Sequence, residues 1–442
     1  MTTELLAPAG TLLSMRYAFA YGADAVYAGQ PRYSLRVRNN EFNRLEALQA
    51  ARTEASALGK KFYLASNLSP HNNKVRTYLR DLEPVIAMRP DALIMSDPGL
   101  IMMVREAWPD QPIHLSVQAN AVNYATVRFW QRQGLTRIIL SRELALDEIE
   151  EIRQQCPEME LEVFVHGALC IAYSGRCLLS GYLAHRDSNQ GACTNSCRWQ
   201  YNAHSATDNE LGELIASSRG AGIDAGAGRD GLAVLLQEQN RPGEYMPAYE
   251  DEHGTYIMNS KDLRAVQHVE RLVRMGIHSL KIEGRTKSHY YVARTTQVYR
   301  QAIDDAAAGR PFDPRLMGEL DHLANRGYTD GFYERRGAAD TQNYEEGISV
   351  NRRHQFVGEV LSYEPASGWL TVKVKNKMTR GETLEIITPK GNHRVTLDAM
   401  EDLEGQRMEI APGDGHTVRI PLCDAMPIAE DGAFTLVMSH RM

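Results

Sequence analysis

The sequence lacks the segments that direct a protein across or into a membrane. Its first ten residues, MTTELLAPAG, contain neither the basic region nor the apolar core that a signal peptide needs. No apolar run approaches the roughly 18 residues that span a bilayer. We therefore expect a chain that contacts no membrane and works in the reducing cytoplasm, where cysteines stay as thiols.

A surplus of positive charge is also missing. The 442 residues contain 49 Lys and Arg against 56 Asp and Glu, which gives a formal net charge of −7. This balance excludes a surface coated in basic residues, but it leaves room for a local basic site that binds RNA. The length allows two or three domains, one of which can be a single large barrel.

Two common hydrolase motifs are absent, since the chain has neither HExxH nor G-x-S-x-G. A formal G-x-G-x-x-G runs from Gly226 to Gly231, but no predicted strand precedes it. The first predicted βα turn has no phosphate-binding loop either. A dinucleotide site therefore lacks the context that it requires.

Cysteine is scarce, yet four of the six cysteines fall within residues 162–201. These four are Cys170, Cys177, Cys193 and Cys197. Four thiols between polar turn residues favour a metal site over small buried hydrophobes or disulfides. The second pair is spaced like a zinc knuckle, whereas the set of four also suits an iron–sulfur cluster. Spacing alone leaves zinc and iron open.

Residues 1–290 alternate between short apolar runs and amphipathic helical stretches. The runs are Leu5–Pro8, Ala25–Ala28, Phe62–Ala65, Ala92–Met95, Ile113–Val117, Arg137–Leu140, Leu161–Val165 and Ser279–Ile282. Buried strands that alternate with helices indicate a parallel sheet, and eight of them fit a (β/α)8 TIM-like barrel. A doubly wound open sheet is the alternative.

Polar residues follow these runs, at the rim where such barrels place their active sites. We predict a pocket for a small molecule or nucleotide there, with substrate-binding residues Arg36, Arg38, Asn67, Gln118, Asn120, Arg142 and Arg285. The catalytic candidates are His166, expected just after the seventh strand, together with Lys281 and Glu283. Arg36 and Arg38, with the nearby Arg32, suit an anionic substrate because a guanidinium matches a carboxylate in a two-pronged contact.

The rest of the chain predicts further modules. Residues 203–255 are rich in small and polar residues, which is typical of an exposed insertion or loop within the barrel unit of residues 1–310. Residues 270–310 contain eight Lys and Arg against four Asp and Glu, so we expect them to contact an RNA backbone. A linker with a short helix follows at 311–350. The alternating pattern of residues 351–442 predicts a small β-barrel that docks RNA.

Several motifs carry a resemblance to a known family. They are Glu4-Leu5-Leu6-Ala7-Pro8-Ala9-Gly10, the segment Glu162-x-Phe164-x-His166-Gly167-Ala168-Leu169-Cys170, the stretch Arg186-Asp187-x-Asn189-Gln190-Gly191-x-Cys193, and Leu280-Lys281-Ile282-Glu283-Gly284-Arg285. This pattern resembles peptidase family U32, the collagenase-like peptidases. Within that family it is most similar to the bacterial branch that hydroxylates tRNA.

The resemblance implies a [4Fe-4S] cluster on the four cysteines. It also implies conversion of the wobble uridine of tRNA to 5-hydroxyuridine with prephenate as co-substrate, and an electron-transfer or cluster-assembly partner. Two other functions stay open. One is a peptidase with Cys170 as nucleophile and His166 as base, and the other is a non-catalytic RNA-binding protein stabilised by zinc.

Overall fold

A computed structural model gives the structure of most of the chain. It describes residues 2–35, 41–169, 173–174, 177, 201–208, 214–216, 233–238, 245–251, 254–255, 261–321, 323, 325, 327–334, 354–422 and 428–440.

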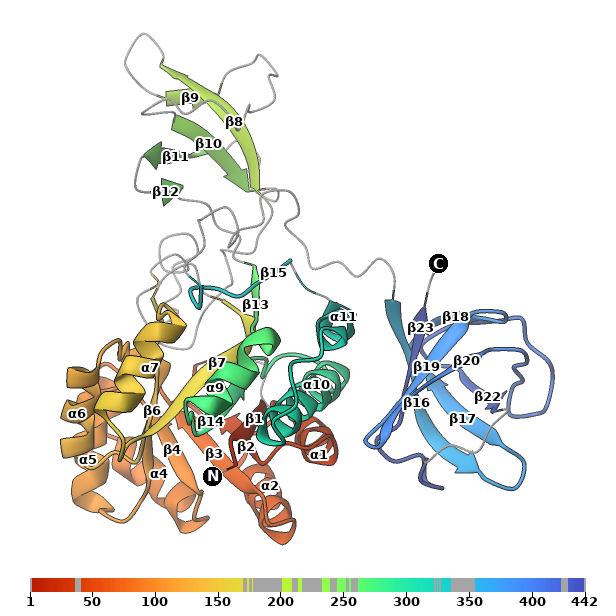
Figure 1. Ribbon diagram of the computed structural model, residues 1–442, viewed down its shortest axis with the longest axis horizontal. Coiled ribbons are helices and arrows are strands. Elements are labelled where there is room, and N and C mark those ends of the chain that lie inside the picture. The colour runs from red at the N-terminus through yellow and green to blue at the C-terminus, as the bar shows by residue number, and fades with distance from the viewer. Residues whose placement is uncertain are drawn as a thin grey trace.

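The first part of the chain forms a closed barrel of eight parallel strands (Figure 1). The strands are β1 (Glu4–Pro8), β2 (Ala25–Gly29), β3 (Lys61–Ser66), β4 (Ala92–Met95), β5 (Ile113–Leu115), β6 (Arg137–Ile139), β7 (Glu160–Ala168) and β14 (Ser279–Ile282). Each pairs with the next, and β14 pairs with both β1 and β7, which closes the ring. The predicted (β/α)8 barrel is confirmed, and the open doubly wound sheet is excluded.

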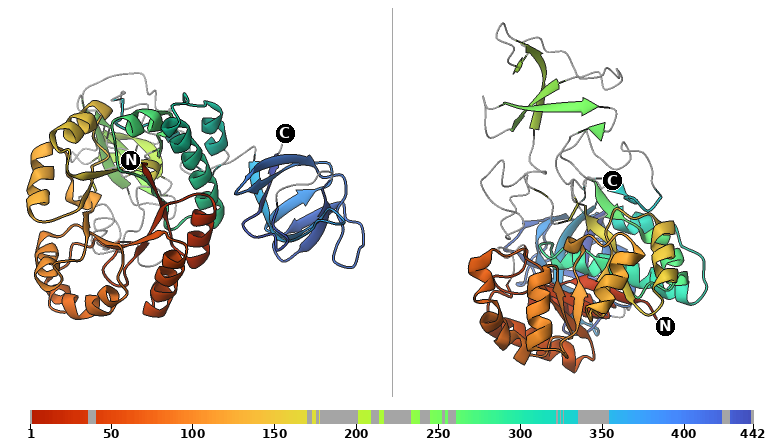
Figure 2. Two further views of the ribbon diagram at one scale, coloured as in Figure 1. Left: turned by 60° about the horizontal axis from the view of Figure 1, so that its bottom comes forward. Right: turned by 90° about the vertical axis from the view of Figure 1, so that its left-hand side faces the viewer.

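Helices surround the barrel as an outer layer (Figure 2). They are α1 (Leu12–Ala20), α2 (Leu45–Ala57), α3 (Asn72–Val75), α4 (Tyr78–Ala87), α5 (Pro98–Ala107), α6 (Tyr124–Arg132), α7 (Leu146–Gln155), α9 (Val269–Arg274) and α10 (His289–Ala307). Short polar side chains start several of them. Thr11 Oγ1, Asp97 Oδ1 and Asn123 Oδ1 each accept a hydrogen bond of 2.9 Å from the backbone N–H three residues on. Among the described residues, no helix is long and apolar enough to cross a membrane.

The barrel sheet continues past its closing seam. Strand β13 (Asp262–Arg264) pairs antiparallel with the end of β7, and β15 (Tyr328–Thr329) pairs with β13. A 3-10 turn at Val266–His268 and α9 follow β13. A short helix, α11 (Arg315–Asp321), follows α10.

Residues 203–255, predicted as an exposed insertion or loop, contain most of a five-stranded antiparallel sheet. Its strands are β8 (Tyr201–Asp208), β9 (Leu214–Ala216), β10 (Ala233–Glu238), β11 (Tyr245–Asp251) and β12 (Gly254–Thr255), in the order β12-β11-β10-β8-β9. The expectation of a loop is therefore corrected for these segments. It failed because glycines cluster at 217–232, outside the described residues, and their composition masked the β-forming runs on either side. Figure 1 shows this sheet beyond the end of the barrel.

The C-terminal residues form antiparallel sheets around a core of their own. The strands are β16 (His354–Glu364), β17 (Trp369–Val374), β18 (Asn376–Thr379), β19 (Thr383–Thr388), β20 (Gly391–Thr396), β21 (Ile410–Gly413), β22 (Thr417–Pro421) and β23 (Leu436–His440). Six of them make one sheet in the order β20-β19-β23-β16-β17-β22, and β18 pairs with β21. This agrees with the period-two pattern of the sequence.

The C-terminal domain packs against α1 and α10. The hydroxyl of Tyr21 donates to the carbonyl oxygens of Phe434 at 2.8 Å and Ile387 at 3.1 Å. Arg294, fully buried on α10, pairs with Glu385 at 3.0 Å. Such buried polar contacts hold the domain in one orientation, because separation would break the buried pair of Arg294 with Glu385, although Glu319 on α11 also pairs with Arg294.

We predict that Gly167→Ala destabilises the protein by about 1–3 kcal/mol. Gly167 has φ of +104°, and a Cβ there would lie 2.4 Å from the backbone oxygen of Glu283, next to an irregularity in the β7–β14 pairing. Thermal or urea unfolding measures the change. Gly318→Ala is the control. It lies exposed on α11 with open space around it, so we expect a gain of about 0.5–1 kcal/mol. Equal effects from both substitutions would contradict the prediction.

Candidate active site

The C-terminal ends of the barrel strands form a ring of polar side chains, which we call the mouth. The mouth consists of Gln30 after β2, Asn67 after β3, Ser116, Gln118 and Asn120 after β5, Arg142 after β6, and Glu283 and Arg285 after β14. In this fold the loops at that end supply the catalytic and binding groups. The structure therefore brings together the predicted residues Asn67, Gln118, Asn120, Arg142, Glu283 and Arg285.

One side of the mouth is held by a chain of hydrogen bonds. Arg285 donates to Ser34 Oγ at 2.7 Å and to the carbonyl oxygen of Leu35 at 2.5 Å. The Leu35 N–H in turn donates to Asn67 Oδ1 at 3.3 Å, and Asn67 Nδ2 donates to Ser116 Oγ at 3.3 Å. The loops after β2, β3, β5 and β14 are therefore tied together. Arg285 shapes the mouth through these bonds to the β2 loop.

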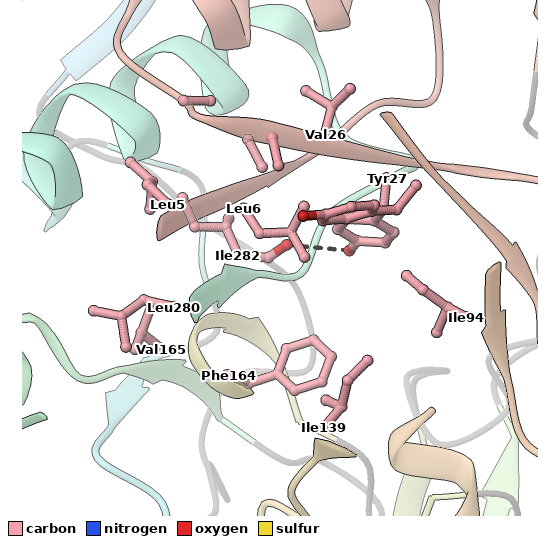
Figure 3. Close-up of a cluster of buried hydrophobic side chains, with 14 of the residues drawn as sticks. Leu5, Leu6, Val26, Tyr27, Ile94, Ile139, Phe164, Val165, Leu280 and Ile282 are labelled. Atoms are coloured by element: carbon pink, nitrogen blue, oxygen red, sulfur yellow. Dashed lines mark hydrogen bonds between the residues drawn. The ribbon is translucent and has the colours of Figure 1, made fainter. Parts of the chain in front are cut away.

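A second group of contacts in the mouth is built around Arg142. Its guanidinium lies 3.9 Å from the centre of the Phe164 ring, donates to the carbonyl oxygen of Ala168 at 2.7 Å, and lies 3.7 Å from Glu283 Oε2. The Tyr27 hydroxyl donates to the carbonyl oxygen of Ile282 at 3.1 Å and lies 3.4 Å from the same Glu283 oxygen. Figure 3 shows Tyr27 and Phe164 among the side chains inside the barrel, with the bond from Tyr27 to Ile282.

Four polar atoms of the mouth are buried without a hydrogen-bond partner among the described residues. They are Gln30 Oε1, Gln118 Oε1, Asn120 Oδ1 and Arg142 Nε. A buried polar atom left unpaired costs about 1–3 kcal/mol, so native structures rarely keep four in one place. Asn120 also has φ of +52°, an uncommon backbone conformation for a residue other than glycine. These residues are therefore the candidates for contact with a polar ligand.

Lys281 lies one layer deeper than predicted, inside the barrel. Its ammonium pairs with Glu162 at 2.9 Å and lies 4.3 Å from the centre of the Tyr27 ring. Burial lowers the pKa of Lys281 below its ordinary value, and the Glu162 carboxylate offsets part of that shift. Below it, Arg137 bridges Glu162 at 3.2 Å and Glu4 at 2.5 Å. Lys281 therefore belongs to a buried ion network under the mouth.

The position predicted for His166 is corrected. It does not follow the seventh strand but lies within β7, because β13 pairs with the strand end and extends it to Ala168. The imidazole is buried against the rings of Tyr291, Tyr299 and Tyr328. Burial lowers the pKa of His166 to about 3. An imidazole this enclosed is a core residue that stays neutral at physiological pH.

Most of the predicted cluster ligands lie outside the described residues, and so do Arg36 and Arg38. Of the four cysteines, Cys177 is described and is half-buried. Nearby, the carbonyl oxygen of Ser174 accepts a hydrogen bond of 2.8 Å from Asn120 Nδ2. This bond fixes Ser174, one point of the cysteine-rich segment, beside the mouth residue Asn120. Cys156 is buried at the end of α7, where its thiol lies 3.6 Å from the carbonyl oxygen of Tyr124.

A second group of metal-ligating types was not visible in the sequence. His268 Nε2 lies 3.5 Å from Asp330 Oδ2 and 3.7 Å from Glu334 Oε1. One imidazole and two carboxylates form a donor set that a divalent cation accepts, and also one that a protonated histidine satisfies. Residues so far apart in the chain meet only through the pairing of β15 with β13.

Gln30 is a mouth residue that the sequence analysis did not name. It directly follows a predicted strand, so the rule that polar residues after barrel strands line the rim could have found it.

The RNA contact predicted at residues 270–310 stays a prediction. Four of its eight cations pair with carboxylates that lie elsewhere in the chain, which a sequence window does not count. Arg271 pairs with Asp147 at 2.5 Å, Arg300 pairs with Asp24 at 2.9 Å, and Arg294 is buried. The fold therefore neutralises part of the positive charge of this segment.

Comparisons with known proteins agree with this architecture. The model of peptidase family U32 matches residues 10–343, and the model of the family U32 C-terminal domain matches residues 352–431. The chain belongs to peptidase family U32. This U32 chain is 63% identical over 426 residues to tRNA hydroxylation protein P of Escherichia coli, a match that covers 95% of this chain and 93% of that protein.

Other U32 relatives extend the comparison. The identity to tRNA hydroxylation protein P of Haemophilus influenzae is 59% over 425 residues, with 94% of this chain and 92% of that protein covered. A solved structure of a U32 peptidase matches with a TM-score of 0.34 and 15% identity, and covers 42% of this chain and 78% of that chain.

We predict that Gln118→Met separates stability from ligand binding. The substitution removes an unpaired buried oxygen while keeping the side-chain volume, so stability stays unchanged or rises by up to about 1 kcal/mol. Loss of the acceptor lowers kcat/KM by about tenfold or more. Unfolding curves and steady-state kinetics measure the two effects.

Gln355→Met is the matched control, because Gln355 Oε1 is also buried and unpaired but lies in the C-terminal domain. We expect it to leave kcat/KM unchanged. If Gln118→Met lowered stability and left the kinetics untouched, Gln118 would be a structural residue.

Proposed function

We propose that this U32 protein hydroxylates tRNA, converting the wobble uridine to 5-hydroxyuridine with an iron–sulfur cluster and a small carboxylate co-substrate such as prephenate. The observation that carries the proposal is the 63% identity to tRNA hydroxylation protein P, which extends over both domains. The mouth supports it independently, because its unpaired atoms suit a nucleotide.

The chemistry of those atoms favours a ligand with hydrogen-bond donors. Gln30 Oε1, Gln118 Oε1 and Asn120 Oδ1 are acceptors, whereas Arg142 Nε is a donor. A carboxylate alone has no donor to offer the three oxygens. A uridine within RNA has the N3–H and the ribose 2′-hydroxyl as donors for these oxygens, which leaves Arg142 Nε for the co-substrate. A base turned out of its stack would therefore satisfy two of the three oxygens.

The carboxylate co-substrate is assigned to the arginines. Arg142 is the described candidate, since its Nε is unpaired and its guanidinium is already oriented by Ala168 and Phe164. Arg36 and Arg38 remain candidates from the sequence. Glu283 is the preferred group for proton transfer, because Lys281 and His166 are enclosed in the barrel, 3% and 1% exposed.

The cysteines are proposed to hold a [4Fe-4S] cluster. With water as the source of the oxygen atom, C5–H and H2O give C5–OH, two protons and two electrons, so the site needs a redox group that accepts the electrons. When bound, an iron–sulfur cluster supplies one-electron chemistry, and an electron-transfer partner would receive the electrons. Four thiolates are the donor set that such a cluster takes, and the bond from Asn120 to Ser174 supports a location beside the mouth.

The peptidase alternative finds less support. A cysteine nucleophile needs a base whose pKa is near neutral and whose imidazole reaches the thiol. His166 is enclosed by tyrosines, and burial lowers its pKa to about 3. In the other alternative, a non-catalytic RNA-binding protein, the cysteines bind zinc instead of an iron–sulfur cluster.

We predict that protein purified without oxygen is brown and contains iron and acid-labile sulfide in near-equal amounts. Cys177→Ala should lose both, whereas Cys156→Ala should retain them, because Cys156 lies apart from the cysteine-rich segment. Elemental analysis and the visible spectrum measure the outcome. Colourless protein with one equivalent of zinc would support the zinc alternative instead.

We predict that cells lacking this protein lose 5-hydroxyuridine from their tRNA. Wild-type protein should restore it and Cys193→Ala should not, as judged by mass spectrometry of tRNA nucleosides. Cys156→Ala removes a thiol that is not one of the four predicted ligands, so it should restore 5-hydroxyuridine as wild type does. Normal 5-hydroxyuridine in the deletion strain, with no second protein of this family present, would overturn the proposal.

A further inference from the structure

An exposed cluster of cations lies on the rim beside the mouth, and we call it the rim patch. It consists of Arg32 in the loop after β2, with Lys74, Arg76 and Arg80 in the segment after β3. The side chains of Arg32 and Arg80 are 66% and 73% exposed, and Arg76 is exposed as well. The sequence has no Asp or Glu from 25 to 40 or from 55 to 80.

One carboxylate sits among these four cations. Asp81 pairs with Arg32 at 3.0 Å and with Arg80 at 3.2 Å. Burial lowers the pKa of Lys74, and the charge of the neighbouring Arg32 lowers it further. The local balance is thus strongly positive on a protein whose net charge is negative. A polyanion that bridges these cations would reduce the repulsion between them.

The rim patch is held in place by buried contacts under it. Tyr33, 1% exposed, donates to Asp81 Oδ2 at 2.8 Å and lies 2.9 Å from Thr77 Oγ1. Its carbonyl oxygen accepts from the Leu68 N–H at 3.1 Å, which joins the loops after β2 and β3. Arg32 itself has φ of +67°, a left-handed conformation that costs an arginine about 1–2 kcal/mol. The backbone is thus fixed, and binding loses little entropy in ordering it.

The patch adjoins the mouth along the chain. Arg32 comes two residues after Gln30, whose Oε1 is one of the unpaired atoms of the mouth. Asn67, another mouth residue, opens the segment that carries Lys74 and Arg76. A ligand that reaches both regions must combine a polar base with a chain of negative charges. Phosphate contacts position a nucleic acid, and base contacts select the nucleotide.

We propose that the rim patch binds the phosphodiester backbone of the RNA whose base enters the mouth. This inference rests on the proposed function and adds the surface that holds the substrate. A small carboxylate does not account for the patch, because exposed ion pairs in water are worth only about 0–1 kcal/mol each. A polyanion gains more, since each neutralised phosphate releases bound counterions.

The test is the salt dependence of tRNA binding by the full-length protein, measured by fluorescence anisotropy with unmodified tRNA. Removing one phosphate contact lowers the slope of log K against log salt concentration by about one. We expect Lys74→Gln and Arg76→Gln each to show this change, and the double variant to bind about tenfold more weakly at low salt. Arg76→Lys should retain the slope, because a phosphate accepts a point charge.

Arg132→Gln is the matched control. Arg132 is an exposed arginine at the end of α6, on the opposite face of the barrel, and its removal should leave the slope unchanged. Unfolding curves verify that all variants fold. If the variants of the rim patch bind like Arg132→Gln while wild type binds and modifies tRNA, the patch is not the binding surface and the proposed function stands. If wild type binds tRNA but leaves its uridine unmodified, the proposed function fails while the slopes still decide the patch. Wild type that fails to bind tRNA overturns both.

Discussion

The barrel depends on a network of opposite charges sealed inside it. Glu4, Arg137, Glu162 and Lys281 come from β1, β6, β7 and β14, so strands from both ends of the barrel sequence meet there. Breaking one such pair by removing a partner costs about 3–5 kcal/mol, because it leaves an uncompensated charge in the core. Burial alone would raise the pKa of Glu4, but Arg137 and Tyr63 bring that pKa below its ordinary value. Each of the four charges has a partner of opposite sign only when the barrel is closed.

Closure of the ring is what creates the mouth. Gln30 and Glu283 are separated by most of the barrel sequence, yet both follow parallel strands and so reach the same rim. The hydrogen bonds from Arg285 to Ser34 and Leu35 then join the last strand to the second. The polar atoms left unpaired in this ring lower the stability of the free protein. Hydrogen bonds to a bound substrate would offset that loss, as is common at functional sites.

The sequence predicted those parts of the fold that depend on local patterns. All eight barrel strands were located within a few residues, because each is a short apolar run buried on both faces. The rim residues Asn67, Gln118 and Asn120 followed from the same pattern, since a parallel barrel aligns its strand ends. The family resemblance was also confirmed.

Features that depend on distant partners were not predictable in this way. His166 was expected at a strand end, but a strand almost a hundred residues later extends β7 past it. In residues 270–310, Arg271 and Arg300 pair with Asp147 and Asp24, carboxylates that lie far away in the sequence. Lys281 was assigned to the rim because the sequence does not give the depth of a side chain within a strand. The cysteine ligands and the two arginines of the β2 loop stay predictions.

The pairing of Ala168 with Asp262 has a consequence for how such a protein can diversify. Residues 169–261 leave and rejoin the barrel at neighbouring strands, which lie about 4.8 Å apart. Any segment whose two ends fit that gap could replace them without moving a barrel strand, since the entropy of closing a loop grows slowly with its length. The barrel thus provides a fixed insertion point for segments of different sequence. A segment with new chemistry could be inserted there while the barrel itself stays unchanged.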